Sequence, residues 1–354
     1  MSPKFSVLNA LAVGVGALLV AQAVGAAPTG DALDRAAVSV RSPERAVLLG
    51  AALAGTRTVA VGERGIIALS DDGGRRWLQA SSPTSTTLTT VRFVDAARGW
   101  AVGHGGVVLA TEDGGKTWTR QLDGRRLAQT LVDAARASGD ARATRDAEHL
   151  LADGPDKPLL DLLVLDPKRL LVVGAYGIAL GSEDGGKTWS SWMPRLPNPK
   201  GLHLYTLRQR GDTLLLAGEQ GLVMLSSDAG RSFRRIETPY KGSFFTAELL
   251  ADQTIVLAGL RGTVLRSADA GANWTPLTVP MPVSITGSSV ASDGRLLLAN
   301  QAGFVMRLQG DQLLPLHATP LPPLNGLLPH AGGAVLALTV QGAMPVPTDS
   351  GPAK

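Results

Sequence analysis

Residues Gly103 to Trp118 read GHGGVVLATEDGGKTW, and the same order of features recurs along the chain. A tight turn ends in a glycine, a short run of β-forming residues follows, and then comes a motif of the form Ser/Thr-x-Asp-x-Gly-x-x-Trp. The turn glycine returns about every 40 residues, apart from one interval of 71. Its positions are Gly65, Gly106, Gly177, Gly221, Gly262, Gly303 and Gly342. Short strands with such a period are typical of a β-propeller, and seven glycines predict seven blades.

Each repeat contains short runs rich in β-forming residues, which predicts an all-β, seven-bladed β-propeller of four-stranded antiparallel blades. The seventh repeat ends before a fourth run. Near the start of the chain, residues 38–41 form an isolated segment of alternating character. We therefore predict that residues 38–41 supply the fourth strand of blade seven and close the ring.

The interval of 71 residues contains an insertion at residues 123–157. Leu127, Leu131 and Ala134 recur at helical spacing, and a second helical segment follows Gly139. This predicts a small helical hairpin between blades two and three. Its many arginine and aspartate side chains are interpreted as a solvated helix face.

The N-terminus has the features of a secretory signal peptide. Lys4 precedes an apolar run, and small residues stand before a cut after Ala26. An uncleaved membrane anchor is the alternative. Cleavage predicts an exported, periplasmic protein. The expected organisation is a signal peptide at 1–26, a flexible leader at 27–37, the propeller at 38–347 and a frayed C-terminal tail at 348–354.

Composition limits the possible partners. The chain has 34 Lys and Arg against 30 Asp and Glu, with the charges interspersed, so nucleic acid is not expected as a partner. It has no cysteine, so the blades must be held by packing and hydrogen bonds alone. No further run reaches the roughly 20 apolar residues of a membrane span. We also find no pattern for a metal or a cofactor.

The repeated Asp motif is interpreted as turn structure rather than as a catalytic site. Aspartate at a turn accepts hydrogen bonds from the N–H groups that follow it, and the second glycine adopts a positive φ without strain. The aromatic residue begins the next strand and can pack between blades. The five copies contain Asp72 and Trp77, Asp113 and Trp118, Asp184 and Trp189, Asp228 and Phe233, and Asp269 and Trp274.

These motifs match the Asp-box, or bacterial neuraminidase repeat. The fuller repeat from Val91 to Trp118 resembles the photosystem II stability/assembly factor family of cyanobacteria and chloroplasts, and its relatives in other bacteria. The resemblance covers blades one to five well and blades six and seven loosely, and it excludes the insertion. It implies a seven-bladed, usually exported propeller whose photosynthetic members are non-enzymatic chaperones for a membrane-embedded subunit.

The resemblance therefore implies a non-enzymatic scaffold that binds a membrane-associated protein, expected at the inner membrane. Family members also carry a basic patch on one face, and Arg64 and Arg261 are candidates for it. The resemblance does not identify a photosystem as the partner.

The turns between second and third strands and the connections between blades should lie on one face of the ring, opposite the Asp-boxes. Loops on one rim of a rigid scaffold commonly bind partners. A plain solvent-exposed turn is the simpler interpretation of each single residue, and His203 and Tyr205 either line the channel mouth or pack within a strand. The candidate partner-binding residues are Glu63, Arg64, His104, Tyr176, Glu219, Gln220, Arg261 and Gln301.

The alternative function is a glycan-binding or glycoside-hydrolysing propeller of the sialidase type, because sialidases share the Asp-box. Such an enzyme needs an arginine cluster and a Tyr–Glu pair, or two facing carboxyl groups. Glu63 and Glu219 are three blades apart, and no set of residues converges in the sequence. We therefore expect no catalytic residue.

Overall fold

The structure is a computed structural model that describes residues 30–347. The predicted signal peptide 1–26, the start of the leader and the tail 348–354 lie outside the described residues. The chain divides into a short unit, Met1–Asp31, and a second unit that begins at Ala32. All elements named below belong to the second unit.

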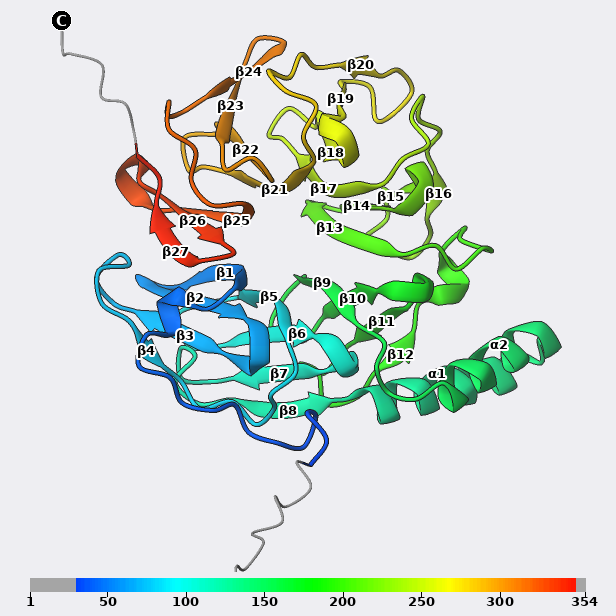
Figure 1. The fold of residues 1–354 in the computed structure, drawn as a ribbon. Coiled ribbons are helices and arrows are strands. Elements are labelled where there is room, and N and C mark those ends of the chain that lie inside the picture. Colours follow the sequence, from blue (N-terminus) through cyan, green and yellow to red (C-terminus); the bar gives the residue numbers. More distant parts are fainter. Residues whose placement is uncertain (1–29, 348–354) are drawn as a thin grey trace, which may run out of the picture. The chain divides into compact units, whose positions relative to one another are not determined.

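Glycine and aspartate interrupt every run of β-forming residues in this unit, so short strands alternate with tight turns. Within residues 30–347 the strands pair in chain order into seven antiparallel sheets, six of four strands and one of three. Figure 1 shows these sheets arranged around a centre. The predicted seven-bladed propeller is therefore confirmed. Blades one to three contain β1 (Leu48–Ala54), β2 (Arg57–Gly62), β3 (Ile67–Ser70) and β4 (Leu78–Gln79); β5 (Leu88–Phe93), β6 (Gly99–Gly103), β7 (Val108–Thr111) and β8 (Thr119–Leu122); and β9 (Leu159–Val164), β10 (Leu170–Gly174), β11 (Ala179–Ser182) and β12 (Ser190–Ser191).

The remaining blades repeat this plan with their first strands toward the centre of the ring (Figure 1). Consecutive first strands lie beside one another, and β25 returns to β1. Blades four to seven contain β13 (Leu204–Arg210), β14 (Thr213–Gly218), β15 (Val223–Ser226) and β16 (Arg234–Arg235); β17 (Phe244–Leu249), β18 (Ile255–Gly259), β19 (Val264–Ser267) and β20 (Thr275–Pro276); β21 (Ile285–Val290), β22 (Leu296–Asn300), β23 (Val305–Gln309) and β24 (Gln312–Pro315); and β25 (Leu324–Pro329), β26 (Val335–Thr339) and β27 (Gly342–Pro345).

A register shift follows the first residue of every first strand, which is the geometry of a β-bulge. Several bulge residues link their strand to the next blade. The Thr89 hydroxyl donates to the Leu159 carbonyl at 2.8 Å, and the Thr286 hydroxyl donates to the Leu324 carbonyl at 2.6 Å. The bulges thus turn side chains of the innermost strands toward the neighbouring blade.

The prediction that residues 38–41 complete blade seven is wrong. Within the described residues, blade seven has three strands, and residues 38–41 form no strand. They lie instead beside β4 of blade one, because the Val40 N–H donates to Gln79 Oε1 at 2.8 Å and Gln79 Nε2 donates to the Val38 carbonyl at 3.0 Å.

The seam between blades seven and one closes by apolar packing rather than by strand exchange. Leu336 and Leu338 of β26 pack with Leu48 and Ala60 of blade one. Asn325 Nδ2 adds a hydrogen bond to the Leu48 carbonyl at 2.9 Å. Side-to-side contacts of this kind join the other blades as well, so the seam needs no additional strand.

The part of the leader that the structure describes differs from the flexible segment that the sequence predicts. Leu33 is 2% exposed and belongs to the apolar cluster of blades one and two. The Ser85 N–H donates to the Ala32 carbonyl at 2.9 Å, and Asp34 forms an ion pair with Arg120 at 2.9 Å. One buried leucine and these polar contacts hold the segment against the propeller from Ala32 onward.

In each turn between the second and third strands of a blade, one position has to be glycine, because atoms of a neighbouring segment lie where a Cβ would be. A Cβ on Gly65 would lie 2.0 Å from the Thr84 carbonyl oxygen, and one on Gly342 would lie 1.9 Å from the Glu44 carbonyl oxygen. Both oxygens belong to segments that lead into the next first strand. The turns and these connections therefore share one face, which we call the rim face. A carbonyl oxygen of the following connection approaches Gly221, Gly262 and Gly303 in the same way, whereas Gly106 faces the Gly124 backbone and Gly177 faces the Asn198 side-chain amide.

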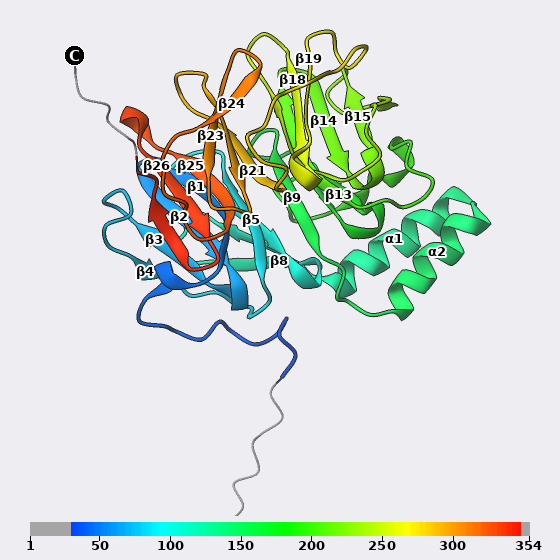
Figure 2. The same ribbon diagram turned by 45° about the horizontal axis from the view of Figure 1, so that its top comes forward.

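The predicted helical hairpin is present and consists of α1 (Gly124–Ser138) and α2 (Ala141–Ala152). Asp123 and Asp140 cap the two helices by accepting hydrogen bonds from the N–H groups that follow them. Leu127 and Leu131 are buried in the apolar cluster of blades two and three. Figure 2 shows the hairpin at the side of the ring, with its far end directed away from the blades. None of the helices within residues 30–347 has the length and apolar character that a membrane crossing requires.

The Asp-box aspartates are hydrogen-bonded within their own turns. In blade two, Asp113 Oδ1 accepts hydrogen bonds from the Thr111 hydroxyl and the Thr117 N–H, both at 2.9 Å. Trp118 Nε1 donates to the Gly115 carbonyl at 2.8 Å, and its ring is buried. Trp274 differs, because its Nε1 donates to the Glu237 carbonyl at 3.0 Å. Equivalent contacts surround Asp72, Asp184, Asp228 and Asp269.

These hydrogen bonds make the folded state sensitive to acid. The backbone N–H of Asn273, its side-chain amide and the Ser267 hydroxyl donate to Asp269 and lower its pKa to about 2. An unfolded aspartate has a pKa of about 3.9. Because the folded pKa is the lower one, the contribution of Asp269 to stability is complete above about pH 4 and is lost as the pH falls toward 2.

We expect the urea midpoint of unfolding to fall steeply between pH 4 and pH 2. Asp269→Asn removes one titrating group, so it should lower the midpoint at pH 7 and make the decline at low pH shallower. Urea titrations of both proteins at pH 7, 4, 3 and 2 measure this difference. Parallel declines in the two proteins would contradict the assignment to Asp269.

Candidate partner-binding face

The rim face carries side chains at positions where the backbone favours glycine. In five blades the second-to-third turn is a single 3-10 turn, and its middle residue has a left-handed conformation. The φ angles are 54° at Arg64, 57° at Tyr176, 52° at Gln220 and 58° at Arg261. Blade two has Gly105 at this position. A side chain there costs of order 1 kcal/mol, and such strain concentrates at functional sites.

Four predicted rim residues project from the fold without an internal partner. Arg64, His104, Arg261 and Gln301 are exposed. In the part of the chain that the structure describes, their side chains have no hydrogen bond or ion pair. They are therefore available to a partner molecule, and a role in binding stays a prediction.

The two predicted glutamates form hydrogen bonds within the fold. Glu63 Oε1 accepts a hydrogen bond from the Val47 N–H, and Glu219 Oε2 accepts one from the His203 N–H, both at 3.1 Å. Each carboxylate thus binds the residue just before the first strand of its own blade. Gln220 Nε2 lies 3.5 Å from Glu219 Oε1. The glutamates accordingly stabilise the rim as well as lining it.

The structure brings Tyr176, His203, Tyr205 and Phe245 into a continuous row, which we call the aromatic track. Consecutive ring centroids are 5.3, 6.2 and 5.5 Å apart, and each pair meets edge to face. The Tyr176 side chain is 49% exposed in its turn of blade three. Tyr205 and Phe245 occupy the bulges of β13 and β17 and line the central cavity. The track thus leads from the rim to the channel.

The inner part of the track carries a neutral hydrogen-bond donor. Burial raises the pKa of the Tyr205 phenol above its ordinary value of 10, and the nearby negative charge of Glu219 raises it further. A hydrogen bond with Ser243 opposes this shift in part. Tyr205 therefore keeps its hydroxyl proton over the physiological pH range.

A buried lysine supports the outer end of the track. The Lys157 side chain is 7% exposed, and its ammonium lies 5.7 Å from the centroid of the Tyr176 ring. Asp156 Oδ1 accepts a hydrogen bond from it at 2.5 Å. Sequence reasoning missed both Lys157 and Phe245, because nothing in the local sequence of either residue indicates that Tyr176 or Tyr205 is its neighbour.

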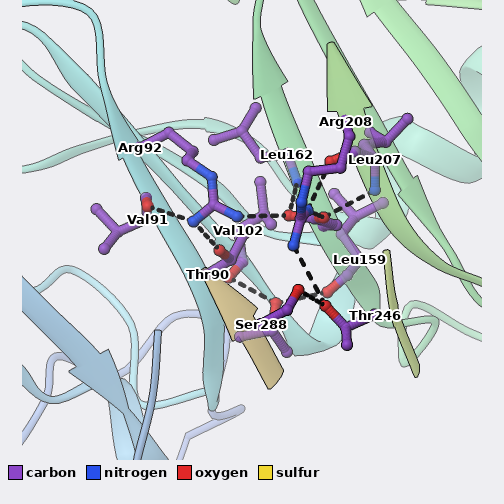
Figure 3. Close-up of polar contacts among 12 residues, drawn as sticks. Thr90, Val91, Arg92, Val102, Leu159, Leu162, Leu207, Arg208, Thr246 and Ser288 are labelled. Atoms are coloured by element: carbon purple, nitrogen blue, oxygen red, sulfur yellow. Dashed lines mark hydrogen bonds and ion pairs between the residues drawn. The ribbon is translucent and has the colours of Figure 1, made fainter. Parts of the chain in front are cut away.

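A polar network lines the central channel and is centred on Asp161 of β9. Figure 3 shows two of its members, Arg92 and Arg208, directed toward each other from different strands. One carboxylate oxygen accepts from Arg92 Nη2 at 3.2 Å and from the Leu162 N–H at 2.9 Å. The other accepts from Arg208 Nη1 at 3.0 Å and from the Leu207 N–H at 2.9 Å. The Asp161 side chain is 7% exposed, so these four donors replace the water that a carboxylate at the surface would bind.

The network continues around the channel to blades five and six. Arg208 Nε lies 3.2 Å from Glu248 Oε1, which also accepts a hydrogen bond from the Ser288 hydroxyl at 2.6 Å. Two arginines and two carboxylates balance in charge. Arg92, Asp161 and Arg208 line a cavity of about 200 Å³ whose walls are mainly polar. This balance is typical of a structural network and not of a site that attracts an ion.

A signal for this network is visible in the sequence. Asp161 is a single acid within the apolar run Leu159–Val164. Arg92, Arg208 and Glu248 likewise interrupt first strands that are otherwise rich in apolar residues or threonine. Charges within an innermost strand indicate a polar channel lining, but their pairing depends on the closed ring.

The channel carboxylates do not form an acid–base pair of the kind that glycosidases use. Such a pair combines one proton donor and one free base or nucleophile. Asp161 and Glu248 both form ion pairs with Arg208, so neither of them is a free base or nucleophile. Within residues 30–347 no group of three or more potential ligand residues is placed to hold a metal ion.

Comparison with protein families shows to which family the chain belongs. The model of the family described as photosynthesis system II assembly factor YCF48 matches residues 39–136 and 149–312, which is well over half of the chain. The chain belongs to this family. The match includes all five Asp-boxes and omits residues 137–148 at the far end of the hairpin.

Individual relatives are distant. The photosystem II assembly lipoprotein Ycf48 of Synechococcus sp. (strain CC9902) is 30% identical over 77 residues. This match covers 22% of the chain and 23% of that relative. The aligned part is thus less than a quarter of the relative's length.

Similar solved structures share the fold across different functions. A YCF48 described as bound to a D1 peptide has a TM-score of 0.65 at 16% identity, covering 88% of this chain and 99% of that one. YCF48 from Cyanidioschyzon merolae has a TM-score of 0.61 at 15% identity, with coverages of 85% and 95%. The GH74 enzyme of Niastella koreensis has a TM-score of 0.64 at 15% identity, with coverages of 87% and 53%. At these identities the likeness establishes the fold alone.

Asp161→Asn should destabilise the propeller by about 3 kcal/mol, because it leaves Arg92 and Arg208 without their shared counter-charge in the channel. Urea unfolding followed by circular dichroism measures the change. Asp311→Asn is the matched control, since Asp311 pairs with Arg266 at the surface with its side chain 65% exposed. The control should lose less than about 1 kcal/mol. Equal losses would show that Asp161 has no special structural role.

Proposed function

We propose that this chain is a non-catalytic propeller that binds a protein partner through its rim face, as an assembly or accessory factor. The observation that carries the proposal is the aromatic track, whose outer end at Tyr176 lies on the same face as Arg64 and Arg261. Within residues 30–347 the side chains of these two arginines have no hydrogen bond or ion pair. Membership of the assembly-factor family supports it, and one relative of this fold is described as bound to a D1 peptide.

The chemistry of the rim fits a protein interface. Tyrosine and arginine are enriched among the residues that dominate binding energy, and exposed rings supply contact area at low entropic cost. Tyr176 is half exposed, and contacts of its ring with His203 and with the Lys157 ammonium set the direction of the ring before binding. A partner that covers Tyr176 would extend the edge-to-face contacts with His203.

We further propose that the protein is exported and that its partner is associated with the inner membrane. The signal-peptide features of residues 1–26 and the family membership support this location. The glycoside-hydrolase alternative has the likeness to the GH74 enzyme in its favour, but that likeness concerns the fold. A screen for sugar released from polysaccharides would revive it.

Expression with the complete N-terminus should give a periplasmic protein that begins at Ala27. Intact-mass measurement of the protein from periplasmic and membrane fractions tests this expectation. Substitution of Ala26 by a bulky residue should slow processing, because cleavage requires small residues there. An intact N-terminus found only in membranes would favour an uncleaved anchor.

Tyr176→Gly separates partner binding from stability. Glycine relieves the positive φ and removes the ring, so the gain and the loss for folding should cancel to within about 1 kcal/mol. Partner binding should fall about 30-fold, as expected for an aromatic residue that contributes about 2 kcal/mol. Crosslinked capture by the tagged mature protein from solubilised membranes, with quantitative mass spectrometry, measures the recovered partner.

Gln253→Gly is the matched control. Gln253 also has a positive φ, of 64°, but it lies in the turn between β17 and β18, on the face that carries the Asp-boxes. It should recover the partner as the unaltered chain does. Charge reversal of Arg64 and Arg261 should reduce recovery further. A partner that is indifferent to Tyr176, Arg64 and Arg261 would contradict binding through the rim face.

A further inference from the structure

A second cavity lies under the helical hairpin, outside the central channel. It is partly open to solvent, is lined mainly by α1, α2 and the connection 193–201 from blade three to blade four, and has a volume of about 590 Å³. Tyr176 lines one part of it, and no other residue of the aromatic track does so. This volume is within the range of about 300–1,000 Å³ that is usual for small-molecule sites.

The cavity exists because the hairpin packs on the propeller only near its base. Leu127 and Leu131 of α1 are buried against blades two and three. Farther along, the helices present Ala134, Ala143 and Ala147 to the connection. Their short side chains do not fill the space between the helices and the connection. The walls are therefore mainly aliphatic.

The walls offer few free hydrogen-bond partners to a peptide backbone. Ser138 and Asn198 line the cavity, but their side chains already bind the backbone of Ala135 and Leu202. Within a helix the backbone N–H and C=O groups are already paired. Pro194 and Pro199 of the opposite wall have no N–H to donate. A peptide in this cavity would leave polar backbone groups without partners, which is costly in a site with apolar walls. A hydrocarbon chain has no such requirement.

The charges that line the cavity have a positive balance. Arg142 and Asp146 of α2 form an exposed ion pair at 3.8 Å. Lys200 of the connection is exposed and, within the described residues, has no ion pair or hydrogen bond. An unpaired ammonium beside an aliphatic cavity favours a ligand with an apolar body and an anionic head.

We propose that the hairpin cavity binds a small amphiphile with a linear hydrocarbon chain and a negatively charged head group. The chain packs against the alanines of α1 and α2 and against Met193 and the prolines of the connection. The head lies at Lys200 and Arg142. This site is independent of the proposed partner binding, although Tyr176 touches both regions.

Titration calorimetry of the mature chain with dodecanoate tests the proposal, with dodecyltrimethylammonium as the ligand of opposite head charge. Dodecanoate should bind at one site and the ammonium compound at least tenfold more weakly. Ala143→Trp fills the cavity from α2 and should abolish dodecanoate binding. Ala141→Trp is the control, because Ala141 is exposed on the same helix outside the cavity and should leave binding unchanged.

Lys200→Glu tests the head-group contact without filling the cavity. Reversal of this exposed charge should weaken dodecanoate about threefold to tenfold and strengthen the ammonium compound. Lys187→Glu, in the Asp-box turn of blade three, should change neither. No binding of dodecanoate, equal binding of both head groups, or binding that survives in both Ala143→Trp and Lys200→Glu would each overturn the proposal. Circular dichroism confirms that each variant is folded.

Discussion

The carboxylate of Asp161 is the contact on which the centre of the ring depends. It accepts hydrogen bonds from the first strands of blades two, three and four, through two arginine side chains and two backbone N–H groups. Arg208 also forms an ion pair with Glu248 of blade five, and Glu248 accepts a hydrogen bond from Ser288 of blade six. Such a network has little value unless every member is in place, since a single missing partner leaves a buried charge. It therefore favours one arrangement of the blades over any slipped one.

The two faces of the propeller differ in how many of their polar side chains are already bonded within the fold. On the Asp-box face, the aspartates, hydroxyls and indole N–H groups satisfy one another within each turn, so little polar capacity is left for a partner. On the rim face, four turns hold side chains in a conformation that glycine would adopt without strain. Strain is confined to the turns and is supported by a rigid sheet beneath each of them. This arrangement fixes the backbone positions from which Tyr176 and the two arginines project.

The seam and the hairpin show how the ring tolerates irregular parts. Within residues 30–347 blade seven has no fourth strand. Leu336 and Leu338 nevertheless pack against blade one, and the other neighbouring blades are joined by apolar contacts of the same kind. The hairpin replaces an ordinary connection between blades and adds Leu127 and Leu131 to a core that already exists. Because each blade contacts only its neighbours, an insertion or a missing outer strand has local consequences. A cavity under the hairpin is one of these consequences.

The sequence by itself determined the number of blades, the Asp-boxes, the hairpin and the family, because each depends on residues that are close together in the chain. A turn glycine, a capping aspartate and a strand of seven residues or fewer leave their signals within a few positions. The tertiary structure decided the rest. Residues 38–41 lie at blade one rather than blade seven, since their partner Gln79 is not identifiable from spacing. The pairing of Asp161 with Arg92 and Arg208 and the row from Tyr176 to Phe245 join residues of different blades, and only the closed ring brings them together.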